Sequence, residues 1–170
     1  MKIKKEQLGL ALLIIFLLLA FQSTSFIGTT AGNLEKDARK SQQINATWDV
    51  SRSVNQYIGA MIFYNTTRDN FIFSIYLNHT GFSLGYFFAS GGATSGIDNH
   101  VKEFEFDQYG SVLISMNTKK IAKIELDNGI EITTIHLDST KPFAEVIPSN
   151  CGKITLYDIK GNEVPLSSEN

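Results

Sequence analysis

The 170-residue chain is poor in cysteine, with Cys151 as its only thiol. A single cysteine excludes an internal disulfide framework, which small exported domains of animals usually carry. An exported chain without such a framework is more typical of bacteria or archaea. Cys151 lies between Asn150 and Gly152, and nothing beside it in the sequence would lower the pKa of its thiol. We therefore expect a small buried or half-buried residue there rather than a nucleophile.

The signature motifs of common enzyme classes are also missing. The histidines His79, His100 and His136 stand alone, with no HExxH or paired spacing. The Gly- and Ser-rich segment 90–96 does not place Ser95 in a G-x-S-x-G elbow, and no Gly-Lys-Ser/Thr ends it as in a phosphate-binding loop. Such a segment is typical of a hairpin loop. The sequence therefore predicts a non-enzymatic protein without a cofactor.

Positive charge is scarce as well. Fifteen Lys and Arg residues stand against seventeen Asp and Glu residues, for a formal net charge of −2. No basic patch with interleaved aromatic residues occurs, so the chain has no electrostatic footprint for nucleic acid.

What the chain does have is an unbroken apolar run, Leu8–Phe21, shortly after three lysines near the N-terminus. A basic start, an apolar stretch and small residues before a cut after Ala31 fit a secretory signal. Counted on to Ile27, the run reaches the roughly 20 residues that a membrane-spanning helix needs, and only uncharged polar residues interrupt it. This length favours a retained signal-anchor over a cleaved signal, with secretion as the alternative. The lysines predict a cytoplasmic N-terminus and an extracytoplasmic segment 33–170.

The rest of the chain divides by composition. Residues 1–31 form the signal peptide or signal-anchor helix, 32–56 a polar juxtamembrane spacer, 57–164 a β-domain and 165–170 a tail. In the β-domain, about eight short apolar runs alternate with turn residues. This pattern predicts an all-β fold, an antiparallel β-sandwich of the Ig-like kind or a small barrel. The spacing of apolar residues over 50–62 also matches one helix face, so a short helix could precede the first strand.

Individual runs predict individual strands. Ile58–Tyr64 and Phe71–Leu77 are joined by a polar loop, and a third strand covers Phe82–Phe88. Asp127-Asn128-Gly129 predicts a hairpin turn, because Asn-Gly accepts positive φ at low cost. After this turn, the apolar parity shifts from Ile130 and Ile132 to Ile135 and Leu137. That shift suggests a β-bulge near Thr133-Thr134.

Aromatic residues crowd the first three strands and occur on both of their faces. Central strands covered on both sides would explain this pattern, and burial is the commoner fate of aromatic side chains. The alternative is an exposed apolar patch that binds a partner. The candidate partner-binding residues are Phe63, Tyr64, Phe71, Phe73, Tyr76, Tyr86 and Phe87.

Acidic residues form a second candidate site. Glu103, Glu105 and Asp107 occupy alternate positions of one predicted strand, and Asp98 precedes them. Carboxylates placed in this way could collect a hard cation such as Ca²⁺. The simpler interpretation is a solvated strand face, because the ordered spacing of an EF-hand loop is absent.

Two resemblances bear on function. The leader helix followed by a small β-domain, together with Ile154-Thr155-Leu156-Tyr157-Asp158 before a Lys-Gly-Asn turn, resembles small, uncharacterised single-pass membrane proteins of Gram-positive bacteria. Gly9-Leu10 and Thr30-Ala31-Gly32 resemble the leaders of type IV pilins and archaeal flagellins. However, bacterial pilins have a glutamate shortly after the cut, whereas Leu10–Phe16 is wholly apolar.

Three hypotheses follow. The first is a membrane-tethered, extracytoplasmic, non-enzymatic module that binds an envelope protein, a cell-wall component or itself. The second is a secreted or tethered sensor that binds Ca²⁺ or another ligand through the 90–107 region. The third is an enzyme such as a hydrolase, although the sequence shows no assembled acid, base and nucleophile. The leader adds a pilin- or archaellin-like filament subunit as a further alternative.

Overall fold

The computed structural model describes residues 28–78, 85–94 and 96–166. The expected signal-anchor over 1–31 lies almost wholly outside these residues. Within the described ranges, no helix has both the length and the apolar character to cross a membrane.

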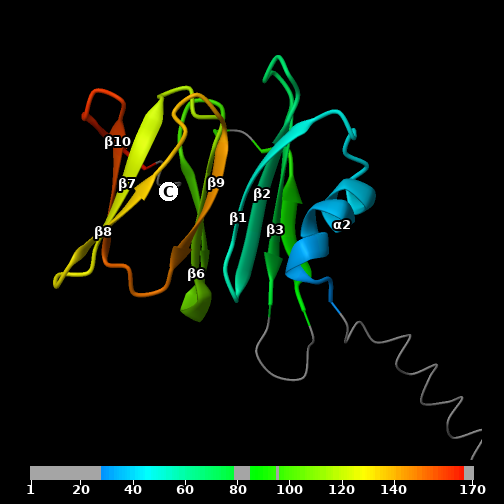
Figure 1. The fold of residues 1–170 in the computed structure, drawn as a ribbon, viewed down its shortest axis with the longest axis horizontal. Helices are drawn as coiled ribbons and strands as arrows, with labels where there is room; N and C mark the ends of the chain where they lie inside the picture. The colour runs from blue at the N-terminus through cyan, green and yellow to red at the C-terminus, as the bar shows by residue number, and fades with distance from the viewer. Residues whose placement is uncertain (1–27, 79–84, 95, 167–170) are drawn as a thin grey trace, which may run out of the picture.

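Three antiparallel sheets and one helix make up the fold (Figure 1). A short 3₁₀ turn, Ala31–Asn33, leads into helix α2 (Leu34–Ser41). The N-terminal sheet has the order β1-β2-β3-β4, with β1 (Asp49–Val54), β2 (Ile58–Tyr64), β3 (Phe71–Leu77) and β4 (Phe87–Gly92). Its strands are therefore consecutive along the chain.

The chain passes back and forth between the other two sheets, so the strands of each are not all consecutive in sequence. The middle sheet has the order β5-β6-β9, with β5 (Lys102–Phe106), β6 (Gly110–Ser115) and β9 (Phe143–Pro148). A 3₁₀ turn, Asp107–Tyr109, joins β5 to β6. The C-terminal sheet has the order β11-β10-β7-β8, with β7 (Ile121–Asp127), β8 (Ile132–His136), β10 (Lys153–Asp158) and β11 (Glu163–Val164).

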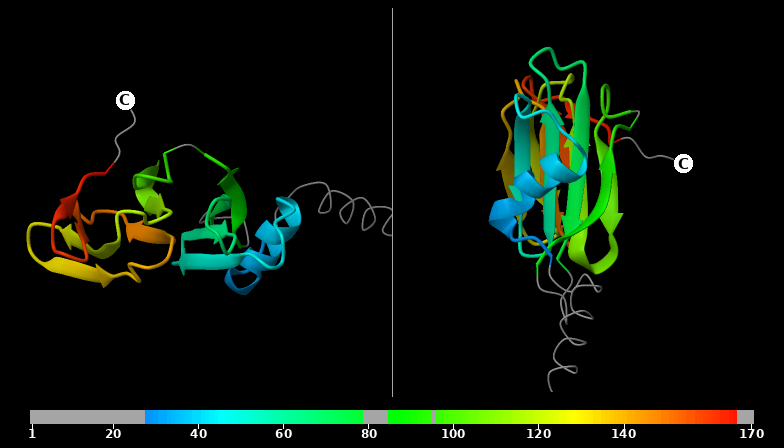
Figure 2. Two further views of the ribbon diagram at one scale, coloured as in Figure 1. Left: turned by 90° about the horizontal axis from the view of Figure 1, so that it is seen from above. Right: turned by 90° about the vertical axis from the view of Figure 1, so that its right-hand side faces the viewer.

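The elements stack in four layers, which Figure 2 shows from above: α2, the N-terminal sheet, the middle sheet and the C-terminal sheet. One core, which includes Ile62 and Ile114, lies between the N-terminal and middle sheets. A second core, which includes Leu113 and Ile124, lies between the middle and C-terminal sheets. A third core packs α2 on the outer face of the N-terminal sheet. Strand β6 thus contributes to a core on each of its faces.

Strand β2 shows why apolar residues occur on both strand faces. All seven of its residues are buried. Ile58 and Ile62 face the middle sheet, whereas Met61 and Phe63 face α2. A strand covered on both sides needs no alternation of apolar and polar residues, so the aromatic crowding is explained by the layers themselves.

Helix α2 is short and polar, but it is integrated into the fold. Leu34 and Ala38 are completely buried on the N-terminal sheet. Arg39 donates to Glu35 at 2.9 Å and lies 4.9 Å above the ring of Phe63. Residues 32–56, expected as a juxtamembrane spacer, therefore contain a docked helix and an edge strand. The helical spacing over 50–62 belongs instead to the β1–β2 hairpin.

The fold class is all-β and antiparallel, as predicted, but the finer expectations need correction. The described residues form several open sheets and no closed barrel. The β-rich fold fits the expected β-sandwich, but it stacks three sheets, whereas an Ig-like sandwich has two. The segment 90–96 was expected as a loop, yet its first residues continue β4 and pair with β3. Gly91 permits this pairing, because a Cβ there would lie 2.7 Å from the carbonyl oxygen of Phe73.

The β7–β8 hairpin confirms the turn at Asp127-Asn128-Gly129 but contains no bulge. Its register runs without interruption from Lys123 opposite His136 to Asp127 opposite Ile132. The apparent change of parity has another cause: Ile130 is 95% exposed and Ile132 is 60% exposed, so neither belongs to the buried set.

Candidate functional site

The predicted partner-binding aromatics are mostly core residues. Five of the seven are buried: Phe63, Tyr64, Phe73, Tyr76 and Tyr86. Phe71 and Phe87 are half-buried, and Phe71 packs on the core between the N-terminal and middle sheets. The structure therefore does not gather these side chains on a surface. The large aromatic that is exposed in this region is Phe88, at 51%.

Tyr76 illustrates how these residues are used. Its ring stacks edge-on against Phe88, with 5.7 Å between centroids, and its hydroxyl donates to Asp37 of α2 at 2.8 Å. Burial and the bond to the Asp37 carboxylate raise the pKa of the Tyr76 hydroxyl. The hydroxyl therefore stays protonated and ties the helix to the sheet.

The predicted cation site is only partly assembled. Glu103, Glu105 and Asp107 line one open groove of about 450 Å³ together with Cys151. Asp98 does not line it. Glu103 accepts a bond from the Ser111 hydroxyl at 2.6 Å. Among the described residues, no group of three or more His, Cys, Asp or Glu side chains is placed to hold a metal ion.

The remaining sequence candidates are dispersed. His79 and Ser95 lie outside the described residues, and His100 and His136 are exposed on different elements. Cys151 is half-buried, and burial raises the pKa of its thiol. These properties fit the expectation of a residue that is not activated as a nucleophile.

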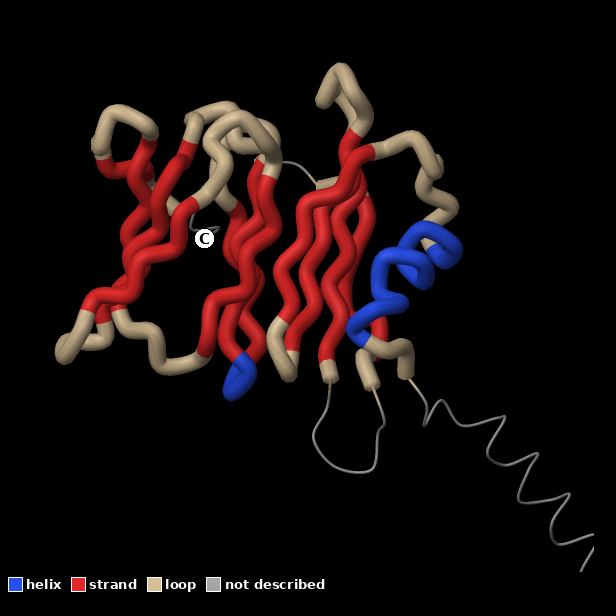
Figure 3. The backbone as a smooth tube through the Cα atoms, viewed as in Figure 1, coloured by secondary structure: helices blue, strands red, loops and turns tan. Residues whose placement is uncertain are grey.

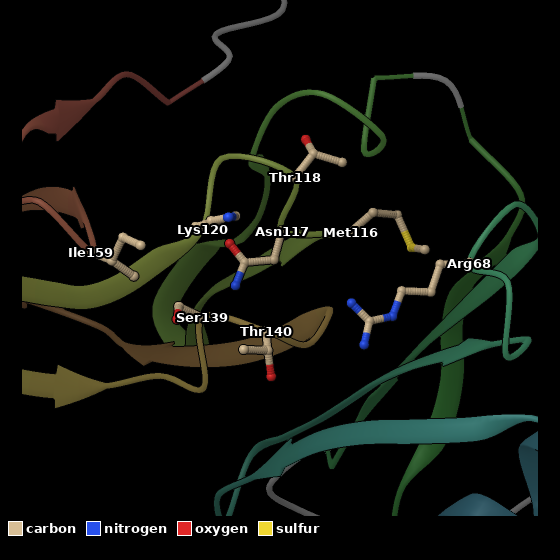
Figure 4. Close-up of a pocket in the computed structure, with 8 residues that line it drawn as sticks. All are labelled: Arg68, Met116, Asn117, Thr118, Lys120, Ser139, Thr140 and Ile159. Carbon is tan, nitrogen blue, oxygen red and sulfur yellow. The ribbon is translucent and has the colours of Figure 1, made fainter.

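A different site emerges where four loops meet at one end of the molecule. The tan loops at the top of Figure 3 include the β2–β3, β6–β7, β8–β9 and β10–β11 connections. Together they enclose a pocket of about 410 Å³ (Figure 4). Its lining residues are Arg68, Met116, Asn117, Thr118, Lys120, Ser139, Thr140 and Ile159.

Asn117 forms the floor of this pocket and is 5% exposed. Its amide nitrogen donates to the carbonyl oxygens of Ile121 and Lys141, each at 3.1 Å. Its amide oxygen accepts from the backbone N–H of Ile121 at 2.7 Å. The amide is therefore fully occupied in holding the β6–β7 turn to the β8–β9 loop, and it is not free to bind a ligand.

Two cations, Arg68 and Lys120, line the pocket, and no carboxylate does. In Figure 4, the guanidinium of Arg68 enters from the β2–β3 hairpin toward Thr140, while Lys120 lies on the opposite side. Within the described part of the chain, neither side chain makes an ion pair or a hydrogen bond. Both cations therefore remain available to a negatively charged group.

Asp138 of the β8–β9 loop already has partners for its carboxylate. It accepts bonds from the Thr140 backbone N–H at 3.0 Å and hydroxyl at 2.6 Å, and Lys141 approaches it at 3.2 Å. These bonds, chiefly from Thr140, lower the pKa of Asp138 to about 2. Thr140 donates its hydroxyl proton to Asp138, and Thr118 donates its own to the carbonyl oxygen of Asp98. Of the hydroxyl groups that line the pocket, that of Ser139 is therefore the one that could bind a ligand beside the two cations.

Backbone strain is concentrated around the same pocket. Arg68, Asn117 and Lys120 have φ values of 59°, 58° and 55°. A left-handed conformation costs most residues about 1 kcal/mol or more, and Asn tolerates it best. Residues held in this way cluster at binding sites, where the surrounding structure fixes them. At Arg68 and Lys120, the conformation sets the direction in which each cation leaves the backbone.

Sequence reasoning missed this pocket. Its residues come from four separate loops, and each loop by itself reads as an ordinary polar turn. The available signal was Lys119-Lys120 after Asn117 in a tight turn, together with a lone Arg68 in the β2–β3 loop. Nothing in the sequence indicated that these loops meet.

Comparisons with protein-family models, with curated proteins and with solved structures give no match to this chain.

Proposed function

We propose that this protein is a membrane-tethered, extracytoplasmic and non-enzymatic binding module whose loop-end pocket takes an anionic group of its partner. The ligand is a carboxylate or phosphate, carried by a cell-wall component or an envelope protein. The observation that carries the proposal is the pair of unpartnered cations, Arg68 and Lys120, in a pocket whose lining holds no carboxylate.

The chemistry of the lining suits such a ligand. An arginine fork can bind a carboxylate or phosphate through two parallel bonds, and a lysine adds a mobile positive charge. Asn117 and its backbone partners keep the pocket floor rigid before the ligand arrives. A rigid site loses little conformational entropy on binding.

The position of the pocket is consistent with a tether. The described chain begins, in blue, at the lower end of Figure 1, whereas the four pocket loops lie at the upper end. If residues 1–31 anchor the chain, the pocket faces away from the membrane. The filament alternative depends on leader residues outside the described ranges, and the Ca²⁺ alternative has no assembled carboxylate cluster in those ranges.

Titration calorimetry on the full chain in a non-ionic detergent tests the proposal. Inorganic phosphate and citrate are the probes, and glucose is the uncharged comparison. We expect the anions to bind, glucose not to bind, and affinity to fall as NaCl is added, because salt screens an exposed ionic contact.

Two variants locate the site. Arg68→Gln should weaken anion binding about 10-fold, since a bond to a charged group is worth about 1.5–3 kcal/mol and 1.4 kcal/mol is tenfold. Arg52→Gln is the matched control, because Arg52 is an exposed arginine on β1 outside the pocket. Equal affinities for the two variants, or glucose heats that match those of phosphate, would refute the proposed site.

A further inference from the structure

Strand β8 has the properties of a docking edge. Each open sheet ends in two strands whose outer backbone groups lack a strand partner, and proteins usually protect such edges. In the described residues, β11 is protected by its length of two residues. Strand β5 carries Lys102, Glu103 and Glu105, and charged side chains discourage pairing.

The other edges are protected by contact or by irregularity. Strands β1 and β9 contact each other across the first two sheets, and the Ser53 hydroxyl donates to Glu145 at 2.9 Å. Strand β4 has a register shift opposite Ile75 and Tyr76 and ends in two glycines, which makes its edge irregular.

Strand β8 has none of these protections. Its sequence, Ile132–His136, contains no proline and no Asp, Glu, Lys or Arg, and its ladder with β7 has no register shift. Ile132 is 60% exposed, and Ile130 in the adjoining turn is 95% exposed. An uncharged, regular edge beside exposed isoleucines is what strand pairing requires.

The hydrogen bonds of the hairpin show which backbone groups are free. Leu137 N–H donates to the carbonyl oxygen of Ala122 at 2.9 Å, and Asn128 N–H donates to that of Glu131 at 3.4 Å. In an antiparallel ladder, every second residue directs its backbone N–H and C=O toward the neighbouring strand. In β8, the odd-numbered residues therefore bond to β7. Ile132, Thr134 and His136 therefore direct their N–H and C=O groups to the open edge.

We infer that this edge pairs with β8 of a second copy of the same chain, antiparallel and two-fold symmetric about Thr134. In this register, Thr134 lies opposite its own copy, and Ile132 lies opposite His136 of the second copy. All three outward-directed residues then donate and accept a backbone bond. The pairing joins two C-terminal sheets into one continuous sheet, and it goes beyond the proposed anion binding.

The second copy is the occupant that best matches this edge. Five uncharged residues are covered by the same five residues, so no like charges oppose each other and no residue of β8 is left over. Side chains also match by face: Ile132, Thr134 and His136 share one face of the sheet, while Thr133, which is exposed, and Ile135, which is half-buried, share the other. In the described part of the chain, the other sheet edges are charged, irregular, covered or too short to serve as partners.

The expected affinity is modest. A five-residue strand pair is much smaller than the roughly 800 Å² per partner of a standard interface. We therefore expect a monomer–dimer equilibrium that becomes visible at high micromolar concentration.

Sedimentation equilibrium of the full chain in a non-ionic, density-matched detergent measures this equilibrium. The wild-type chain should shift toward dimer as concentration rises. Thr134→Pro should remain monomeric, because it removes an outward N–H without breaking the ladder to β7. Thr134→Val, which keeps that N–H, is the matched control and should dimerise like the wild type. Unchanged circular dichroism and melting temperature would establish that Thr134→Pro is folded.

Cross-linking tests the register independently. In the background Cys151→Ser, Thr134→Cys should form a disulfide-linked dimer under a mild oxidant, because facing Cα atoms of a hydrogen-bonded pair lie about 5.5 Å apart. Ile132→Cys should not, since its two copies would be offset by about 13 Å along the strand. A wild-type chain that stays monomeric, a dimerising Thr134→Pro, or equal cross-linking at both positions would overturn the inference.

Discussion

Replacing Asn117 should be among the most damaging single changes outside the cores, because its side chain holds together the loops that build the pocket. Besides a long contact to the carbonyl oxygen of Asp138 at 3.4 Å, Asn117→Ala removes three short bonds: two donated by the amide nitrogen, to Ile121 and Lys141, and one accepted from the Ile121 N–H. Each is worth about 1 kcal/mol net. Alanine at a φ of 58° adds about 1 kcal/mol of backbone cost. The expected loss of unfolding free energy is about 4 kcal/mol.

Two further variants separate these contributions. Asn117→Gly loses the same bonds but tolerates the backbone conformation, so it should be about 1 kcal/mol more stable than Asn117→Ala. Asn150 also has a positive φ, of 62°, but it is exposed. Asn150→Ala should therefore lose only the backbone contribution, about 1 kcal/mol.

Urea unfolding followed by the fluorescence of Trp48, the only tryptophan, measures all four chains in the same detergent. A loss below about 1 kcal/mol for Asn117→Ala would refute the role of the buried amide, since one net hydrogen bond alone is worth that much. Equal stabilities of the alanine and glycine variants would refute the backbone contribution.

The remaining predictions concern the layer contacts. Burial raises the pKa of Glu145, although a bond from Ser53 opposes the shift. A raised carboxyl pKa favours folding at low pH, and that contribution is lost as pH rises above the ordinary value of 4.5 through the folded-state pKa. Glu145→Gln should therefore be more stable than the wild type at pH 7, by about 0.5 kcal/mol because part of the carboxyl remains in water. Melting temperatures of both chains from pH 4 to pH 8 measure this, and a lower melting temperature of the variant at pH 7 would contradict it. Gly59→Ala should cost about 1–3 kcal/mol, because its Cβ would lie 2.6 Å from Leu34 Cδ1 under α2. Combining it with Leu34→Ala should cost less than the sum of the two single losses, and strictly additive urea-unfolding energies would exclude that contact.

Local sequence pattern predicted the strands well where both faces are covered. The apolar runs Ile58–Tyr64 and Phe71–Leu77 are β2 and β3 with the expected bounds. The Asn-Gly turn of the β7–β8 hairpin was equally clear, since its backbone requirement is local. Such features depend only on residues that are close in sequence, so they can be predicted without knowing how the sheets stack.

Features that depend on distant segments were not predictable in this way. Helix α2 contributes two buried residues, Leu34 and Ala38, too few to mark a docked helix in a polar segment. The third sheet was missed because apolar residues on both faces of β6 indicate only that each face is covered. They do not indicate whether a helix or another sheet covers it. The pocket was missed because Arg68 and Lys120 become neighbours only after the sheets have stacked.

The position of β9 late in the chain has a consequence for synthesis. Helix α2 precedes β2, so one face of the N-terminal sheet can be covered as soon as its strands are made. The opposite face is completed by Ala144 and Val146 of β9, which emerge only after four intervening strands. Until then that face is covered only in part, by β6 residues such as Val112 and Ile114, and its remaining apolar surface is of the kind that aggregates or recruits chaperones. Strand β9, which completes the core between the N-terminal and middle sheets, is thus also the strand whose synthesis ends the exposure of that apolar face.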